Sequence, residues 1–190
     1  MSVALPAKNI FRRLSDLPKL LSLITSESDA FVAIRLPRVR DFTIGMLPHG
    51  YAPEAVLDPA AVRFPTKWEG IFFNYHERWV AIDGARNYAM ERAYLHIYLR
   101  ELGDLQAVSL HCDPLIEPDD ASFRFKRGPH LHLAGAVPDI SRTHISICAA
   151  DKAMGGNNLG SLTSTMKAGL GLLVDELIPA YNRHLETLGL

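Results

Sequence analysis

The sequence predicts an α+β fold: an antiparallel sheet with an N-terminal helical segment and a long C-terminal helix packed on one face. Two patterns support this prediction. Short runs of alternating apolar and polar residues follow one another between residues 93 and 149, separated by turn signals. Apolar residues recur every three or four positions at both chain ends. Since 190 residues is the length of one domain, we expect a single domain over residues 1–190.

The N-terminal segment is predicted to be helical because its apolar residues have helical spacing. These residues are Ile10, Leu14, Leu17, Leu21 and Ile24. The stretch SDLPK interrupts the pattern, with Asp16 able to cap a helix and Pro18 suited to its first turn. We therefore expect two short helices rather than one straight helix. The basic residues Lys8, Arg12, Arg13 and Lys19 are predicted to form the solvent-facing side.

The first half of the sheet is less regular in the sequence. Residues 30–36 predict a strand, and the stretch DFTIGML predicts a short one. Residues 70–84, rich in bulky aromatics, predict either a strand pair or one long bent strand. The following stretch ARNYAMERA is expected to form a short helical turn. Between the first strand and residue 70 lies a proline-rich irregular connection, and connections of this length are often functional.

The second half of the sheet has clearer alternation. Strands are predicted over residues 93–100, 105–112, 122–126, 130–134 and 143–149. A long amphipathic helix is predicted within 159–187, kinked or split at Pro179 because proline lacks a backbone donor. The apolar residues predicted to be buried beneath this helix are Leu131, Leu133, Ile145 and Ile147.

The polar positions of these strands form the candidate site. His130 and His132 share one face because side chains two apart on a strand point the same way. A simple hairpin register about VPDI places His144 on the neighbouring strand, close to His132. Further polar residues on or beside these strands are His111, Arg124, Lys126, Arg142 and Ser146. The same alternation is typical of an ordinary solvated sheet face, and the sequence leaves both interpretations open.

Two chemistries fit this set of residues. His130, His132 and His144 could be ligands of a divalent metal such as zinc, since imidazole is its commonest protein ligand. Alternatively the same histidines could be the catalytic groups of a hydrolase. In that case Arg124, Lys126 and Arg142, with Ser146 and His111, would hold a small anionic, phosphate-bearing ligand.

Neither phosphoesterase pattern that these strands approach is complete. HLHLA has Ala134 where histidine-triad hydrolases carry a third histidine. HLHL has His132 where an H-x-[ST]-x element of the 2H phosphoesterases needs serine or threonine. A different class of function also stays open, a non-catalytic interaction or homo-oligomerisation module that uses exposed aromatics such as Trp68 or Trp79.

Composition argues against several other classes. The net charge of −1 gives no strong nucleic-acid signal, and no apolar run approaches the ~20 residues of a membrane span. The first residues lack the order of a signal peptide, so we expect a cytoplasmic protein. The two cysteines, Cys112 and Cys148, end or follow apolar runs and are predicted to be buried and reduced.

Overall fold

The computed structural model describes residues 4–26, 31–35, 40–46, 63–99, 105–112, 130–133, 143–146 and 159–188. The strands among them are β1 (Ala4–Pro6), β2 (Phe31–Arg35), β3 (Phe42–Met46), β4 (Phe64–Pro65), β5 (Ile71–Ile82), β6 (Asn87–Leu99), β7 (Leu105–Cys112), β8 (His130–Leu133) and β9 (Thr143–Ser146). The helices are α1 (Ala7–Leu21), α2 (Leu159–Leu172) and α3 (Ile178–Leu188).

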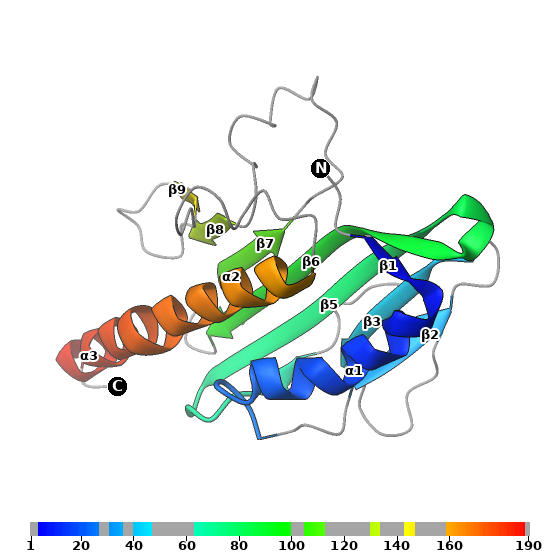
Figure 1. The fold of residues 1–190 in the computed structure, drawn as a ribbon. Helices are drawn as coiled ribbons and strands as arrows, with labels where there is room; N and C mark the ends of the chain where they lie inside the picture. Colours follow the sequence, from blue (N-terminus) through cyan, green and yellow to red (C-terminus); the bar gives the residue numbers. More distant parts are fainter. Residues whose placement is uncertain are drawn as a thin grey trace.

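The described strands form one sheet, and each pairing between them is antiparallel. Their order is β2-β3-β5-β6-β7-β8-β9, with β1 beside β6 and β4 beside β5. Helices lie toward both chain ends, and Figure 1 shows α1 and α2 on the same side of the sheet. The predicted combination of an antiparallel sheet with helices at both ends is therefore confirmed.

Two long strands, β5 and β6, form the centre of the sheet. They pair from Ile71↔Leu99 to Ile82↔Asn87, with an irregularity between Arg78 and Trp79. Most of residues 70–84 thus belong to one long strand, β5, rather than to a strand pair. The helical turn predicted for ARNYAMERA is wrong, because β6 begins at Asn87 and the turn is confined to Asp83–Ala85. Continuous cross-strand pairing outweighs the local helical preference of this stretch.

Helix α1 is continuous through Pro18, so the prediction of two short helices is wrong. Pro18 lies in the last turn, and its own carbonyl accepts a hydrogen bond from the Ser22 amide at 2.9 Å. Leu17 and Leu21, on either side of the proline, are fully buried, and Leu14 on the same apolar side is partly buried. Burial of these leucines stabilises the last turn by more than the single missing hydrogen bond costs.

The sequence predicted Arg13 to lie on the solvent-facing side of α1. That prediction is wrong, because the Arg13 side chain is fully buried. Its Nε and Nη2 donate to Glu77 Oε1 at 2.9 and 2.6 Å. Its Nη1 donates to Thr163 Oγ1 on α2 at 3.1 Å. Burial alone would lower the pKa of Arg13, but the attraction of Glu77 raises it above the ordinary value. The guanidinium is therefore charged, and it joins α1, β5 and α2.

The carboxylate of Glu77 has further donors on its own strand. Tyr75 Oη donates to Oε1 at 2.5 Å, and Trp79 Nε1 donates to Oε2 at 2.8 Å. Trp79 is fully buried, so its predicted role as an exposed interface aromatic is wrong; Trp68 is partly buried against the core. Cys112 is buried in the same core, as predicted, and Cys148 lies outside the described residues.

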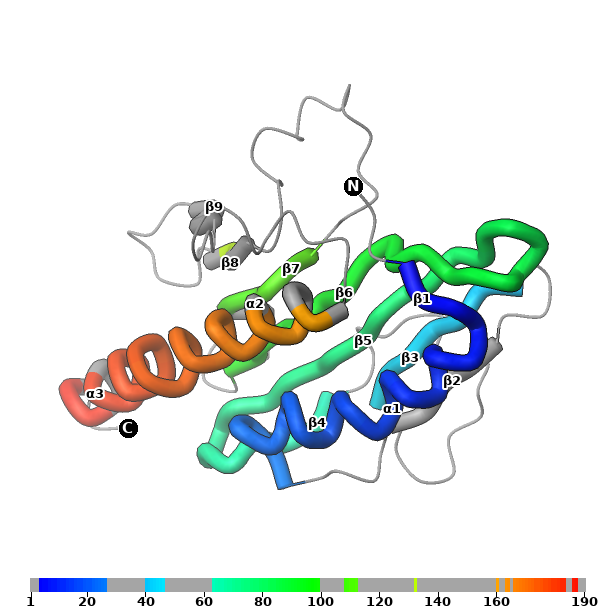
Figure 2. The backbone as a smooth tube through the Cα atoms, viewed as in Figure 1, coloured from blue at the N-terminus to red at the C-terminus, as the bar shows by residue number. Residues whose placement is uncertain are grey.

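The C-terminal helical run is divided into three parts. A π-helical turn, Leu173–Leu177, separates α2 from α3 and ends two residues before Pro179. The Ile178 amide bonds the Leu173 carbonyl, five residues back. Figure 2 shows the backbone following one continuous path through the three parts. Pro179 is the second residue of α3, so the helical run is not split at the proline as predicted; the wider turn just before it accommodates the missing donor.

Several predicted features lie wholly or partly outside the part of the chain that the structure describes. The predicted strand 122–126 and Ile147 lie outside the described residues. Leu131 occupies a register position opposite the buried Leu110, and Ile145 lies opposite Leu131. None of the helices in the described segments combines the length and the apolarity that a membrane crossing requires.

Candidate functional site

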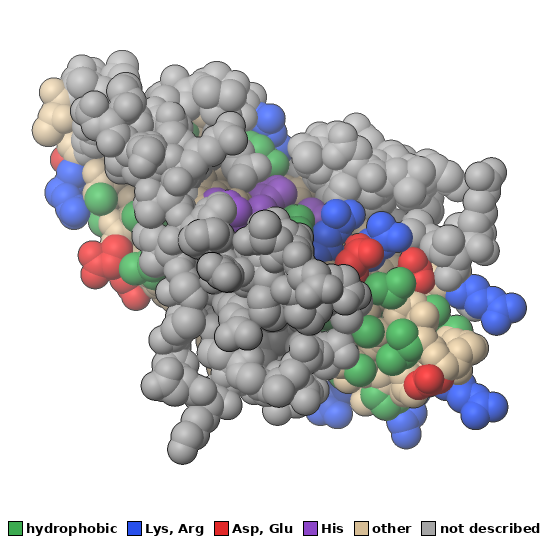
Figure 3. All heavy atoms as spheres, turned by 90° about the horizontal axis from the view of Figure 1, so that it is seen from above, with side chains coloured by type: hydrophobic (Ala, Val, Ile, Leu, Met, Phe, Trp, Pro, Cys, Tyr) green, Lys and Arg blue, Asp and Glu red, His purple; other side chains and the backbone are tan. Residues whose placement is uncertain are grey.

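The sheet register aligns polar residues in two neighbouring rows that run across five strands, β5 to β9. The first row is Asn74, His96, Ser109, His132 and His144. The second row is His76, Tyr94, His111, His130 and Ser146. Six of the eight histidines of the chain belong to these rows, which we call the histidine rows. They occupy the face opposite Tyr75 and Glu77, and Figure 3 shows histidine side chains gathered on one face.

The middle of the histidine rows contains two imidazoles in direct contact. His96 Nε2 and His111 Nε2 are 3.1 Å apart. The ring of Tyr94 stacks on His111 with centroids 4.0 Å apart, and the ring of His132 lies 4.3 Å from His111. His76 approaches His96 edge-on, at 6.0 Å between ring centroids. The rings of three histidines from β6, β7 and β8 therefore meet around His111.

Burial keeps the inner histidines neutral. Burial lowers the pKa of His76 to about 3, helped by the nearby His96 and Arg92. Burial also lowers the pKa of His96 to about 4. Both rings consequently carry no charge at pH 7, and each keeps one nitrogen lone pair. His111 and His132 are only half-buried.

Arginines lie at the margin of the rows rather than among the inner histidines. The Arg92 guanidinium is 5.7 Å from the Tyr94 ring centroid, and the Arg63 guanidinium is 4.4 Å from that of Tyr98. Arg78 pairs with Asp41 at 3.4 Å and with Glu91 at 3.2 Å. Figure 3 shows basic and acidic side chains beside the histidines. The described part of the site thus combines a neutral interior with a charged margin.

His96 Nδ1 and Ser109 Oγ, on cross-strand neighbours of β6 and β7 in the first row, are buried polar atoms without a hydrogen-bond partner among the described residues. Ser109 is fully buried and His96 is 9% exposed. A buried polar group without a partner costs about 1–3 kcal/mol, and such groups in native proteins point to a bound water or ion.

A complete metal site is not present in the described residues. No group of three histidine, cysteine or acidic side chains within these ranges is arranged to hold a metal ion. His96 and His111 supply two nitrogen atoms that could bind one ion together. A third ligand would have to come from elsewhere in the histidine rows or from outside the described residues.

The predicted site residues have different outcomes. His132 pairs with His144 across β8 and β9, as the hairpin register required. His130 lies opposite both His111 and Ser146, although only the backbone of His130, His144 and Ser146 is described. The predicted basic residues Arg124, Lys126 and Arg142 lie outside the described residues.

The sequence interpretation underestimated the contribution of β5 and β6. It did not include His76, Asn74 or Tyr94 in the candidate site. The alternation of Asn74 and His76 within FFNYHER was the available signal. Asn74 and His76 join the candidate site only because β5 and β6 lie beside β7 in the sheet, and local alternation does not encode strand order.

Comparisons with protein-family models, with curated proteins and with solved structures found no match to this chain.

Proposed function

We propose that this protein binds a divalent transition-metal ion, with Zn²⁺ as the simplest case, through His96 and His111 in the histidine rows. The observation that carries the proposal is the 3.1 Å separation of their Nε2 atoms. Zinc binds imidazole nitrogen at about 2.0–2.1 Å, so two nitrogens on one ion lie roughly 2.9–3.4 Å apart for angles between 90° and 110°. The pair already has the spacing of two ligands of one ion.

The same spacing also suits a hydrogen bond from one neutral imidazole to the other. Binding an ion would replace that hydrogen bond and require both Nε2 lone pairs. The hydrogen of each ring would then reside on Nδ1. Because His96 Nδ1 is buried, we expect a water or a serine hydroxyl such as that of Ser109 to accept its hydrogen.

The protonation state favours a metal over a phosphate at this position. Phosphate is held by charged donors, whereas His76 and His96 stay neutral far below pH 7. A neutral imidazole is the form that binds a metal, so no proton has to be displaced from His96 at pH 7. Their low pKa values also make these two rings poor general acids at neutral pH.

Additional ligands would come from the β8 end of the rows. His132 is the first choice because its ring lies beside His111, and His130 and His144 occupy adjacent register positions. Three imidazoles and an open fourth position would activate a water molecule for hydrolysis. Hydrolase activity is therefore the reaction class we propose for the metal-bound protein. We further infer that α2 covers part of the opposite face of the sheet, where Met166 and Leu170 are buried.

The metal proposal is tested by elemental analysis of the purified protein, followed by calorimetric titration of chelator-treated protein with ZnCl₂. We expect saturable binding of one Zn²⁺ per chain. His111→Gln should weaken the affinity at least about 100-fold, since it removes a direct ligand. His132→Ala should also weaken it, while changing the free energy of unfolding only slightly because His132 is half-buried.

A matched control is His184→Gln, which removes a histidine from α3 rather than from the sheet. Its zinc affinity should equal that of the unmodified chain. Circular dichroism of each variant checks that the sheet is intact. Absence of saturable zinc binding, or equal loss in the His184 control, would contradict the proposal.

A further inference from the structure

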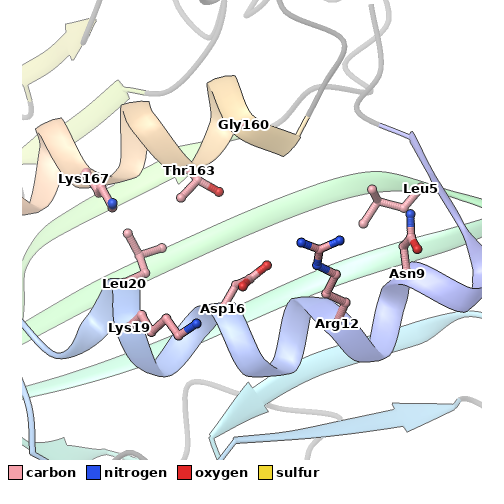
Figure 4. A pocket seen from close by; sticks show the side chains of 9 residues that line it. All are labelled: Leu5, Asn9, Arg12, Asp16, Lys19, Leu20, Gly160, Thr163 and Lys167. Atoms are coloured by element: carbon pink, nitrogen blue, oxygen red, sulfur yellow. The ribbon is translucent and has the colours of Figure 1, made fainter.

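A groove lies between α1 and α2, on the helical side of the sheet, away from the histidine rows, and its lining combines polar side chains with Leu5, Leu20 and Gly160. Its volume is about 500 Å³. Figure 4 shows side chains of both helices directed into it. The polar residues that line it are Asn9, Arg12, Asp16, Lys19, Thr163 and Lys167. A volume of this size falls within the range of about 300–1,000 Å³ that small-molecule sites occupy.

The groove has an excess of positive charge. Arg12, Lys19 and Lys167 each contribute +1 and Asp16 contributes −1, so the sum of these four side chains is +2. Arg12 and Lys19 come from α1, whereas Lys167 lies across the groove on α2. None of these four side chains forms an ion pair with another residue in the described part of the chain. Their charges are therefore available to a ligand.

The base of the groove includes a hydroxyl that already accepts one hydrogen bond from within the protein. Thr163 Oγ1 accepts a hydrogen bond from the buried Arg13 at 3.1 Å, and Arg13 is itself fixed by Glu77. Within the part of the chain that the structure describes, no group accepts the hydroxyl hydrogen of Thr163. The hydrogen bond from Arg13 thus fixes the position of the Thr163 hydroxyl, and its O–H can donate a hydrogen bond to a ligand in the groove.

We propose that this groove binds a small phosphate monoester. A monoester carries about −1.5 to −2 charges at pH 7, which matches the sum of +2. Its terminal oxygens accept hydrogen bonds only, and Arg12, Lys167 and Thr163 supply donors from both helices. Asp16 and Asn9 supply acceptors, so the remainder of the ligand is a polar body that carries hydroxyl groups. The groove also exceeds the volume of phosphate alone.

Binding is tested on metal-free protein at constant ionic strength, so the outcome does not depend on the histidine rows. Inorganic phosphate, glycerol 3-phosphate and vesicles of anionic phospholipid are the three probes, and calorimetry or amide chemical shifts are the measurement. We expect saturable binding of the soluble monoester, tighter than that of inorganic phosphate. No saturable binding of the monoester, or a preference for vesicles, would overturn the assignment.

Single substitutions then locate the site. Arg12→Gln and Lys167→Gln should each weaken monoester binding by about tenfold, the loss expected for one partly screened charged donor. Asp16→Asn should strengthen binding, because it removes the negative charge. Lys8→Gln is the matched control, since Lys8 is exposed on α1 and does not line the groove. An equal loss of monoester affinity in Lys8→Gln would show that the monoester responds only to the net charge of the protein, and it would overturn the proposal.

Discussion

Replacing Arg13 with methionine tests whether the buried ion pair between α1 and β5 supports the fold. Arg13 and Glu77 are both fully buried, with Arg13 Nη2 2.6 Å from Glu77 Oε1. Methionine keeps much of the side-chain length but removes both hydrogen bonds from Arg13 to that oxygen. Tyr75 and Trp79 would still donate to the carboxylate, yet no positive charge would remain beside it.

The structure allows the size of the effect to be worked out. Each hydrogen bond to a charged group contributes about 1.5–3 kcal/mol, so the loss of two predicts about 3–6 kcal/mol. Removing one partner of a buried ion pair typically costs about 3–5 kcal/mol, in agreement with that sum. We therefore expect the free energy of unfolding to fall by about 3–5 kcal/mol. This is a large part of the ~5–15 kcal/mol typical of a domain.

Urea unfolding followed by far-ultraviolet circular dichroism measures the change. Arg12→Met is the matched control, because Arg12 is the exposed neighbour on the same helix; it should change the free energy by less than about 0.5 kcal/mol. The double variant Arg13→Met with Glu77→Met should lose less than the two single losses added together. A loss below about 1 kcal/mol for Arg13→Met alone would refute the reasoning.

Three further predictions concern other parts of the sheet. Burial lowers the pKa of His76 to about 3 and that of His96 to about 4, whereas a histidine in the unfolded chain has a pKa of ~6.5. Between these pH values the unfolded chain therefore binds more protons than the folded protein. Urea titrations of the metal-free protein should show stability fully present above about pH 6.5 and falling toward pH 4; a flat profile would contradict neutral histidines. Ala85 has a φ of 68°, so Ala85→Gly should stabilise the protein by about 0.5–1 kcal/mol in thermal unfolding, and destabilisation would argue against that turn. In a Cys148→Ser variant, the buried Cys112 should react with a thiol reagent only after denaturation, whereas rapid native labelling would place it at the surface.

The sequence predicted those parts of the fold that follow from local patterns. Alternation located β7 and β8 within a residue or two, and helical spacing found the buried side of α1, including Ile10 and Leu17. The sequence interpretation predicted that Arg13 is exposed to solvent, because an arginine on a helix is usually exposed. Burial of Arg13 depends on its ion pair with Glu77 on β5. No local sequence pattern reveals that partner, because it lies 64 residues away in the chain.

The candidate site was predictable in the same partial way. Period-two spacing identified His130 and His132, and the short turn aligned His132 with His144. The contact between His96 and His111 depends on β6 lying beside β7 with that register. A shift of one residue would place either ring on the other face. Strand order and register are set by the whole core, so they become visible only in the structure.

The hydrogen bond between Arg13 and Thr163 also constrains when this protein can finish folding during its synthesis. The two residues are 150 positions apart in the chain. At about 5–20 residues per second, a ribosome needs roughly 8–30 s to travel from one to the other. During that interval α1 and the growing sheet exist without α2, so the guanidinium and the Glu77 carboxylate lack part of their cover and stay hydrated. The helical side of the sheet therefore closes late, and a chain that stops before residue 163 cannot complete it.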